Sequence, residues 1–275
     1  MKPYLPKIIG FIINVIGIFS KSLAARLAIK LFGTPLKGRF SEDEQAFLKE
    51  AKYDTFDCRG FDIQTYKWQG TGDTVILAHG WESNTYRWRD LIHALTALDF
   101  TVISLDGPAH GNSSGKRFNT LDYSACLAEV AKKHKADSII GHSVGGMATV
   151  FSISFHKVSG LKKIVLLGAP SNFTGILKRY GQMMDYSSRV MKAITTNIEK
   201  EFKHPPEFFN AFEFSKDISA EGLIIHDQKD PIIPFSDAND YKTHMLNAKL
   251  IETKGLGHGL KSEAVYKHIT EFLMA

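Results

Sequence analysis

The stretch Ser138-Ile139-Ile140-Gly141-His142-Ser143-Val144-Gly145-Gly146-Met147 decides the fold of this 275-residue chain. An apolar run is followed by the pattern G-x-S-x-G and then by the small residues of a helix. This order predicts a sharp strand-to-helix turn that holds Ser143 in a strained backbone conformation and exposes its hydroxyl at the carboxyl edge of a sheet. Gly141 and Gly145 are needed because a side chain at either position would collide across the turn.

Strand-like runs alternate with helical stretches on both sides of this turn. Strands are expected at 61–68, 74–78, 101–105, 138–140, 163–167, 223–225 and 249–251. Helices are expected near 87–98, 120–134, 144–156, 236–244 and 261–273. Such alternation predicts right-handed crossovers and a mostly parallel central sheet flanked by helices, in the α/β class. Residues 172–217 contain no strand-like run and are rich in Phe and Met, which indicates a helical cap inserted into the sheet domain.

A serine hydroxyl needs a base to become a nucleophile, and the base needs a carboxylate that fixes its tautomer. His258 is the candidate base, because it follows the last expected strand in the loop Gly257-His258-Gly259. Two aspartates compete for the third place. We favour Asp230, in a turn locked by Pro231 and Pro234, and interpret Asp227, directly at the strand end, as a turn or solvent residue.

An oxyanion formed during acyl transfer needs backbone N–H donors. Val144, the residue after the nucleophile, is expected to supply one of them. Trp81 is expected to supply the other from the loop His79-Gly80-Trp81, where Gly80 permits the required backbone turn.

Together these residues resemble the α/β-hydrolase superfamily. The resemblance covers roughly residues 73–275, and the order serine, aspartate, histidine is the chain order of that family. It rests on four features besides the serine turn: His79-Gly80-Trp81, the loop Asp106 to Ser113, Asp230-Pro231-Ile232-Ile233-Pro234 and Gly257-His258. The resemblance implies an α/β-hydrolase fold over residues 51–275, with the cap at about 172–217. The stretch before residue 50 does not match the family pattern, and its own residues indicate an N-terminal helical arm over residues 1–50.

The resemblance further implies a serine esterase that needs no cofactor. Ser143, His258 and Asp230 would cleave a carboxylic ester of a small or medium apolar acyl group through an acyl-enzyme. A thioesterase, an acyltransferase or a carbon–carbon hydrolase would use the same triad, and a ligand-binding protein that does not turn over is a rival from another class. Met183 and Met184 in the cap are candidate pocket residues, and His110 is interpreted as structural with pocket lining as the alternative.

Composition excludes several other classes. The 34 Lys and Arg exceed the 29 Asp and Glu by only five, and they are scattered, so no nucleic-acid partner is expected. Cys58 and Cys126 lack metal-ligand spacing, so no metal site is expected, and free thiols are favoured over a bridge. The oligomeric state is left open.

The N-terminal arm is unusually apolar. Residues 8–19 carry one polar residue, Asn14, and the next stretch, 23–32, is a basic amphipathic helix with Arg26 and Lys30 on one face. Three interpretations stay open: an arm docked on the main domain, an element that binds a membrane surface through residues 8–32, and a signal peptide, preceded by Lys2 and Lys7, that is cleaved near Ala24. A cytoplasmic protein is favoured, either free or membrane-associated, with export after cleavage as the alternative.

Overall fold

The computed structural model describes residues 4–275, and the chain forms two units. The sheet unit comprises residues 35–171 and 211–275, and the helical unit comprises the chain up to residue 34 together with residues 172–210. Lys2, one of the two lysines noted ahead of the apolar stretch, lies outside the described residues.

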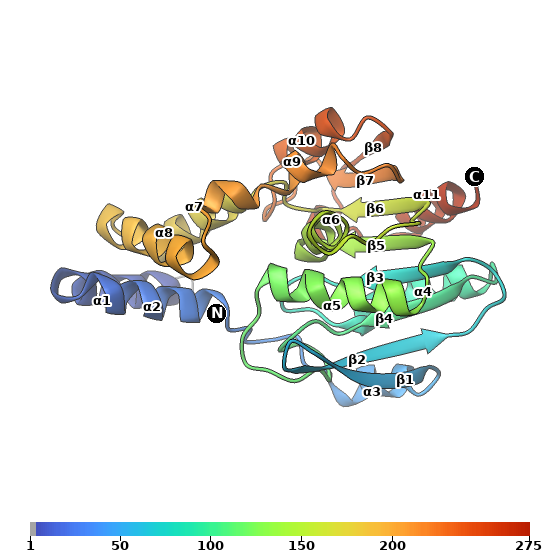
Figure 1. Cartoon of the computed structure of the whole chain (residues 1–275), viewed down its shortest axis with the longest axis horizontal. Helices are drawn as coiled ribbons and strands as arrows, with labels where there is room; N and C mark the ends of the chain where they lie inside the picture. The colour runs from blue at the N-terminus through green and yellow to red at the C-terminus, as the bar shows by residue number, and fades with distance from the viewer. Residues whose placement is uncertain (1–3) are drawn as a thin grey trace. The chain divides into compact units, whose positions relative to one another are not determined.

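The sheet unit is built on an eight-stranded sheet in the order β1-β2-β4-β3-β5-β6-β7-β8, counted over residues 4–275 (Figure 1). Strands β1 and β2 are antiparallel to their neighbours, and all other pairs are parallel. The bounds are β1 Lys52–Cys58, β2 Phe61–Trp68, β3 Thr74–Ala78, β4 Thr101–Leu105, β5 Ser138–His142, β6 Lys163–Leu167, β7 Glu221–Asp227 and β8 Ala248–Thr253. The mostly parallel sheet expected from the sequence is confirmed, although β1 was not anticipated.

Helices cover both faces of the sheet (Figure 1). One face carries α3 (Glu42–Leu48), α4 (Arg89–Thr96) and α11 (Glu263–Met274), and the other carries α5 (Thr120–Lys133) and α6 (Val144–His156). The unit also contains α9 (Ala211–Ser215), α10 (Ser236–His244) and the short 3-10 helices η1 (Thr85–Trp88) and η3 (Gly257–Gly259). Helix α3 begins with a capping box, because Ser41 and Glu44 each accept a hydrogen bond from the other's backbone N–H.

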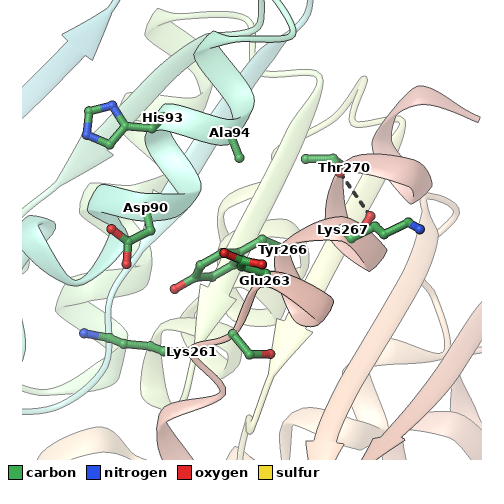
Figure 2. A pocket seen from close by; sticks show the side chains of 9 residues that line it. Asp90, His93, Ala94, Lys261, Glu263, Tyr266, Lys267 and Thr270 are labelled. Carbon is green, nitrogen blue, oxygen red and sulfur yellow. Dashed lines mark hydrogen bonds between the residues drawn. The ribbon is translucent and has the colours of Figure 1, made fainter.

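On the outer side of the first layer, α4 and α11 leave a surface depression of about 630 Å³ (Figure 2). Its lining is mixed in charge and includes Asp90, His93, Lys261, Glu263 and Lys267.

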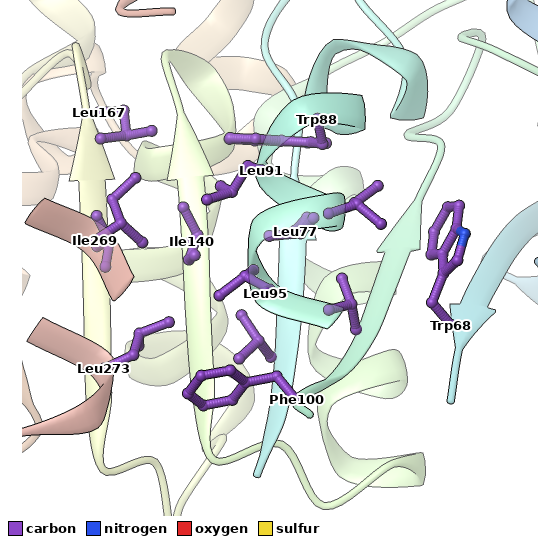
Figure 3. Close-up of a cluster of buried hydrophobic side chains, with 14 of the residues drawn as sticks. Trp68, Leu77, Trp88, Leu91, Leu95, Phe100, Ile140, Leu167, Ile269 and Leu273 are labelled. Carbon is purple, nitrogen blue, oxygen red and sulfur yellow. The ribbon is translucent and has the colours of Figure 1, made fainter. Parts of the chain in front are cut away.

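Beneath this depression, the same two helices bury their apolar faces on the sheet (Figure 3). Leu91 and Leu95 from α4 and Ile269 from α11 pack against Leu77 of β3 and Ile140 of β5. Because side chains alternate across a strand, the intervening residues of β3 and β5 point into the opposite layer, under α5 and α6. Both faces of the central strands are therefore shielded from solvent, which explains why their sequences are continuous apolar runs.

The helical unit consists of α1 (Leu5–Phe19), α2 (Lys21–Phe32), α7 (Phe173–Met184), α8 (Ser188–Phe202) and η2 (Pro206–Phe209). The two N-terminal helices therefore share one core with the expected cap helices. Ala24 and Ala28 of α2 and Val190 and Ile194 of α8 are buried together in it. The arm ends earlier than expected, since residues 35–50 belong to the sheet unit.

The two cysteines form a disulfide bond, which contradicts the expectation of free thiols. Cys58 at the end of β1 is joined to Cys126 of α5, with their Cα atoms 5.7 Å apart. Their spacing of 68 residues gave no indication of this contact, because it arises only when α5 packs across the edge of the sheet. No helix among residues 4–275 has the length and apolar composition to span a bilayer.

Candidate active site

Ser143 lies on the turn between β5 and α6, as its sequence context predicted. Its φ of 53° and ψ of −127° fall in a region that residues with a side chain rarely adopt. The turn is fixed from both sides, because the Ser143 N–H donates to the carbonyl of Leu167 at 2.8 Å and the Ser143 carbonyl accepts from the N–H of Gly146 at 2.9 Å. The strained backbone is therefore held by its neighbours on β6 and α6.

The two glycines of the motif allow this turn to pack closely. A Cβ atom on Gly141 would lie 2.5 Å from the carbonyl oxygen of Gly145. A Cβ atom on Gly145 would lie 2.2 Å from the carbonyl oxygen of Ala78, at the end of β3. Both contacts are with backbone atoms that cannot move aside, so the sequence requirement for glycine is confirmed.

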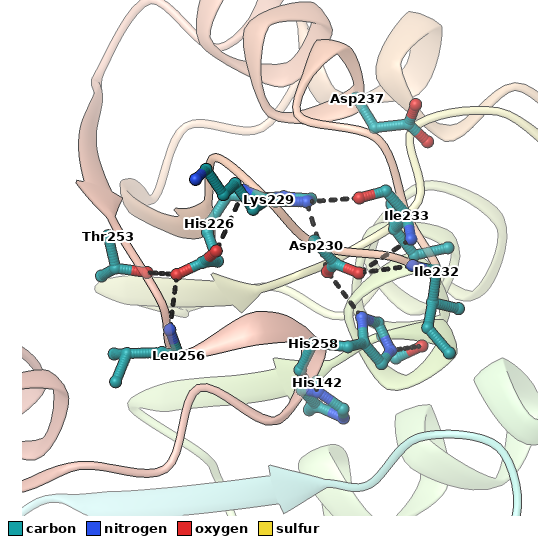
Figure 4. A network of polar contacts seen from close by, with 12 residues as sticks. His142, His226, Lys229, Asp230, Ile232, Ile233, Asp237, Thr253, Leu256 and His258 are labelled. Carbon is teal, nitrogen blue, oxygen red and sulfur yellow. Dashed lines mark hydrogen bonds and ion pairs between the residues drawn. The ribbon is translucent and has the colours of Figure 1, made fainter.

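His258 and Asp230 meet Ser143 from the two loops that follow β8 and β7. Nε2 of His258 lies 3.0 Å from Oγ of Ser143, and Nδ1 of His258 lies 2.7 Å from Oδ2 of Asp230. The other oxygen of Asp230 accepts from the N–H groups of Ile232 and Ile233 at 2.8 and 3.0 Å (Figure 4). Serine, imidazole and carboxylate thus form one hydrogen-bonded chain.

Asp230 is ionised in this arrangement. Burial would raise the pKa of its carboxyl group, since the side chain is fully covered. The hydrogen bonds from His258, Ile233 and Ile232 outweigh burial and hold the pKa of Asp230 below its ordinary value. With Oδ2 beside Nδ1, the carboxylate fixes the proton of His258 on Nδ1 and leaves Nε2 free to accept a proton from serine.

Asp227 has a different place from the one expected. It is fully buried, so the interpretation as a solvent residue is wrong, although it does belong to the turn. Its carboxylate accepts from the N–H groups of Lys229 and Leu256 and from the hydroxyl of Thr253 (Figure 4). Asp227 therefore ties the end of β7 to the loop that carries His258, and it does not touch the imidazole in place of Asp230.

Two residues that the sequence interpretation missed hold the same loop. Nε2 of His142 donates to the carbonyl of His258 at 2.7 Å, and the guanidinium of Arg87 donates to the carbonyl of Gly259 at 2.9 Å. Both side chains are buried. His142 occupies the variable position of G-x-S-x-G, so the motif gave no sign of its role, and Arg87 lies at the start of an expected helix whose pattern does not mark it.

The loop proposed to supply an oxyanion donor lies directly beside the serine. A Cβ atom on Gly80 would be 2.9 Å from Cβ of Ser143. Val144 is the first residue of α6, so its N–H has no partner within the helix. The indole of Trp81 packs edge-on against the rings of His110 and Phe118 at 5.5 Å.

The candidate pocket residues divide into two groups. His110 is fully buried, and its Nδ1 faces the carbonyl of Pro108 while its Nε2 accepts from the N–H of Glu82, so the alternative that it lines a pocket is wrong. Met184 is buried in the core of the helical unit and is likewise not a pocket residue. Met183 on the same helix is 53% exposed and stays a candidate.

The surface depression between α4 and α11 is not the site of this chemistry. The residues that line the depression between α4 and α11 do not include Ser143, Asp230 or His258. Within residues 4–275, His, Cys, Asp and Glu side chains do not gather in a group of three or more that would suit a metal ion.

Comparison with known proteins places the chain in a family. The family model described as "alpha/beta hydrolase fold" matches residues 73–215, which is just over half of the chain. The chain therefore belongs to the α/β-hydrolase family, and the family expected from the sequence is confirmed.

Individual curated relatives match this chain at low sequence identity. The pimeloyl-acyl-carrier-protein methyl ester esterase of Vibrio atlanticus is 27% identical over 146 residues, which cover 52% of this chain and 54% of that enzyme. The non-heme haloperoxidase of Rhodococcus erythropolis is 24% identical over 71% of this chain and 89% of its own. The chain spans about half or less of the length of the first four curated relatives it matches.

Among solved structures, the esterase EaEST from Exiguobacterium antarcticum aligns with a TM-score of 0.65. It is 16% identical and covers 82% of this chain and all of its own. At this identity the likeness concerns the fold alone.

Three buried histidines around the serine predict that stability falls in mild acid. Burial lowers the pKa of His79 and His142 well below 6.5 and that of His110 to about 4. Below pH 6.5 these histidines therefore bind protons in the unfolded chain but stay neutral in the folded chain. Each of them lowers the free energy of unfolding by about 1.4 kcal/mol per pH unit. Asp106 offsets one of the three, because burial raises its pKa to about 6 and the folded state takes up that proton.

We expect the free energy of unfolding to fall by about 2–3 kcal/mol between pH 6 and pH 5. Guanidinium titrations across this range measure it. The matched variant His110→Gln should reduce the pH slope by about one proton. A slope that is flat in the native chain, or unchanged in the variant, would show that these histidines titrate normally in the fold.

Proposed function

We propose that the chain is a serine hydrolase that cleaves carboxylic esters of small or medium apolar acyl groups. The observation that carries the proposal is the unbroken chain from Oγ of Ser143 through His258 to Asp230, with contacts of 3.0 and 2.7 Å. A buried serine on a strained turn within hydrogen-bond distance of an imidazole has no evident structural purpose, whereas it is the arrangement that makes a hydroxyl nucleophilic.

The reaction follows from these positions. Oγ of Ser143 attacks the ester carbonyl while Nε2 of His258 takes its proton, and Asp230 stabilises the imidazolium that forms. The N–H groups of Val144 and Trp81 receive the developing oxyanion. The imidazolium then gives its proton to the departing alcohol, and water, deprotonated by the same imidazole, attacks the acyl-enzyme and releases the acid.

A relative named as a methyl ester esterase supports ester cleavage, and the serine nucleophile supports acyl transfer. The same residues would serve a thioester or a carbon–carbon substrate, so the bond type is tested directly by comparing an ester with its thioester. The rival from another class, a binding protein of this fold, would show neither an acylation burst nor turnover on an activated ester.

The first prediction concerns the nucleophile. A fluorophosphonate probe should label Ser143 alone, and Ser143→Ala should abolish labelling and lower kcat on a p-nitrophenyl ester by up to about 10⁶, because only binding and oxyanion effects remain. Intact-protein and peptide mass spectrometry locate the label. Ser159→Ala, at an exposed loop serine, is the control and should change neither result. Labelling that persists in Ser143→Ala would refute the assignment.

A second prediction separates the two aspartates. Asp230→Asn should lower kcat by about 10³–10⁴, because the amide presents the wrong partner to Nδ1 of His258. Asp227→Asn should instead lower the free energy of unfolding by about 1–3 kcal/mol, since it weakens a buried acceptor of three hydrogen bonds. Its kcat should fall less than about tenfold. Steady-state rates and denaturant unfolding measure both, and a larger loss of kcat in Asp227→Asn would reverse the roles.

The third prediction concerns the acyl group. Each methylene buried in an apolar pocket gains up to about 0.8 kcal/mol, so kcat/KM should rise severalfold per carbon up to about 4–8 carbons. A series of p-nitrophenyl esters measures the profile. Met183→Ala should flatten it, whereas Met184→Ala should lower stability by about 2–5 kcal/mol because Met184 is packed in a core. A preference for acetyl over hexanoyl esters would contradict the proposed acyl class.

A further inference from the structure

Helix α1 carries an apolar face that the other helices of its unit leave exposed. Six large side chains form this face: Ile8, Phe11, Ile12, Val15, Ile18 and Phe19. Phe11 is 67% exposed and Phe19 is 85% exposed. At 100° per residue these positions share one side of the helix, so the exposed face is continuous along its whole length.

The opposite face of α1 anchors the helix firmly. Gly10 lies so close to α7 that a Cβ atom on it would overlap the carbonyl of Met184. Asn14 donates to the carbonyl of Asp185 and accepts from the N–H of Ser187, which ties α1 to the turn between α7 and α8. The apolar outer face is therefore presented on a fixed scaffold, and packing within the helical unit does not account for it.

Helix α2 of the same unit carries exposed positive charge. Its exposed residues include Lys21, Arg26 and Lys30 together with Leu23 and Leu27. Residues 1–34 contain five Lys and Arg and no Asp or Glu. A helix that mixes exposed leucines with cations suits the boundary between hydrocarbon and lipid headgroups.

The charge of the whole chain is divided in the same way. The helical unit holds eleven Lys and Arg against four Asp and Glu, a net charge of +7. The sheet unit, by the same count, has a net charge of −2. The basic excess of the protein thus lies entirely on the unit that bears the exposed apolar face.

We propose that α1 and α2 dock the protein on an anionic membrane surface. The apolar face of α1 enters the acyl boundary, and the cations of α2 contact lipid phosphates. With 15 residues, α1 is about 22 Å long, which suits a helix lying in the interface better than one crossing the bilayer. A second copy of the chain is a poorer occupant, because a two-fold contact through this face would set two strongly basic units against each other.

Vesicle flotation of the full-length chain tests the proposal. Vesicles of phosphatidylcholine with 30% phosphatidylglycerol should bind the protein, vesicles of phosphatidylcholine alone should bind it much less, and 500 mM NaCl should weaken binding to the anionic vesicles. Ile8→Glu with Ile12→Glu should abolish binding. Arg26→Gln with Lys30→Gln should weaken it roughly 25-fold, at about fivefold per cation.

Matched controls separate surface docking from general charge effects. Lys52→Gln with Lys249→Gln removes the same charge from exposed positions of the sheet unit and should leave vesicle binding unchanged. Hydrolysis of a soluble ester should be the same in all these variants. Two results would overturn the proposal: absence of binding to anionic vesicles, or binding that both charge variants weaken equally.

Melting temperature and light scattering test whether another part of the chain, or a second copy of it, lies on the apolar face of α1. The Ile8→Glu, Ile12→Glu variant should melt within a few degrees of the native chain, because its positions are on the surface. A large loss of stability would mean that another part of the chain covers the face. A native dimer that this variant dissociates would identify a second copy as the occupant, and either outcome would overturn membrane docking.

Discussion

The close approach of the Ser143 turn to the end of β3 is the constraint on which the rest of the sheet unit depends. Gly145 lies against the carbonyls of Ala78 and His79, so the first turn of α6 packs on the sheet edge where the paired strands β3 and β5 end. In an open parallel sheet this is the position at which connections leave toward opposite sides. The strain at Ser143 costs about 1–3 kcal/mol, and only a fully packed sheet can hold it.

Because the turn at Ser143 is fixed, the loops after β7 and β8 must bring Asp230 and His258 to it. Such loops are held in place by hydrogen bonds from buried side chains. Three buried groups supply them for the segment around His258. Asp227 binds the N–H of Leu256, His142 binds the carbonyl of His258, and Arg87 binds the carbonyl of Gly259. A 3-10 turn flanked by glycines would otherwise be free to move, so the imidazole owes its 3.0 Å contact with serine to backbone hydrogen bonds on either side of it.

Sequence patterns predicted what depends on local order and failed where distant segments meet. The serine turn, strands β2 to β8 and the positions of His258 and Asp230 follow from neighbouring residues, and the sequence predicted them. The disulfide, the buried place of Asp227 and the roles of His142 and Arg87 depend on partners 26 to 172 residues away. Strand β1 was missed because its exposed side chains are polar and only its pairing with β2 marks it as a strand.

The disulfide and the helical unit concern the cellular location and the cleavage that were considered from the sequence. A bond between residues 68 positions apart removes about 4 kcal/mol of chain entropy from the unfolded state, and it ties the edge strand β1 to α5. Such bonds persist in oxidising compartments and are rare in the cytosol, and the cytoplasmic location favoured by the sequence stays a prediction. Ala24 is fully buried inside α2, and α1 and α2 build one core with α7 and α8, so cleavage near Ala24 would remove part of that core. The proposed membrane docking therefore requires a chain that keeps both helices, because α1 carries the exposed apolar face and α2 carries exposed cations.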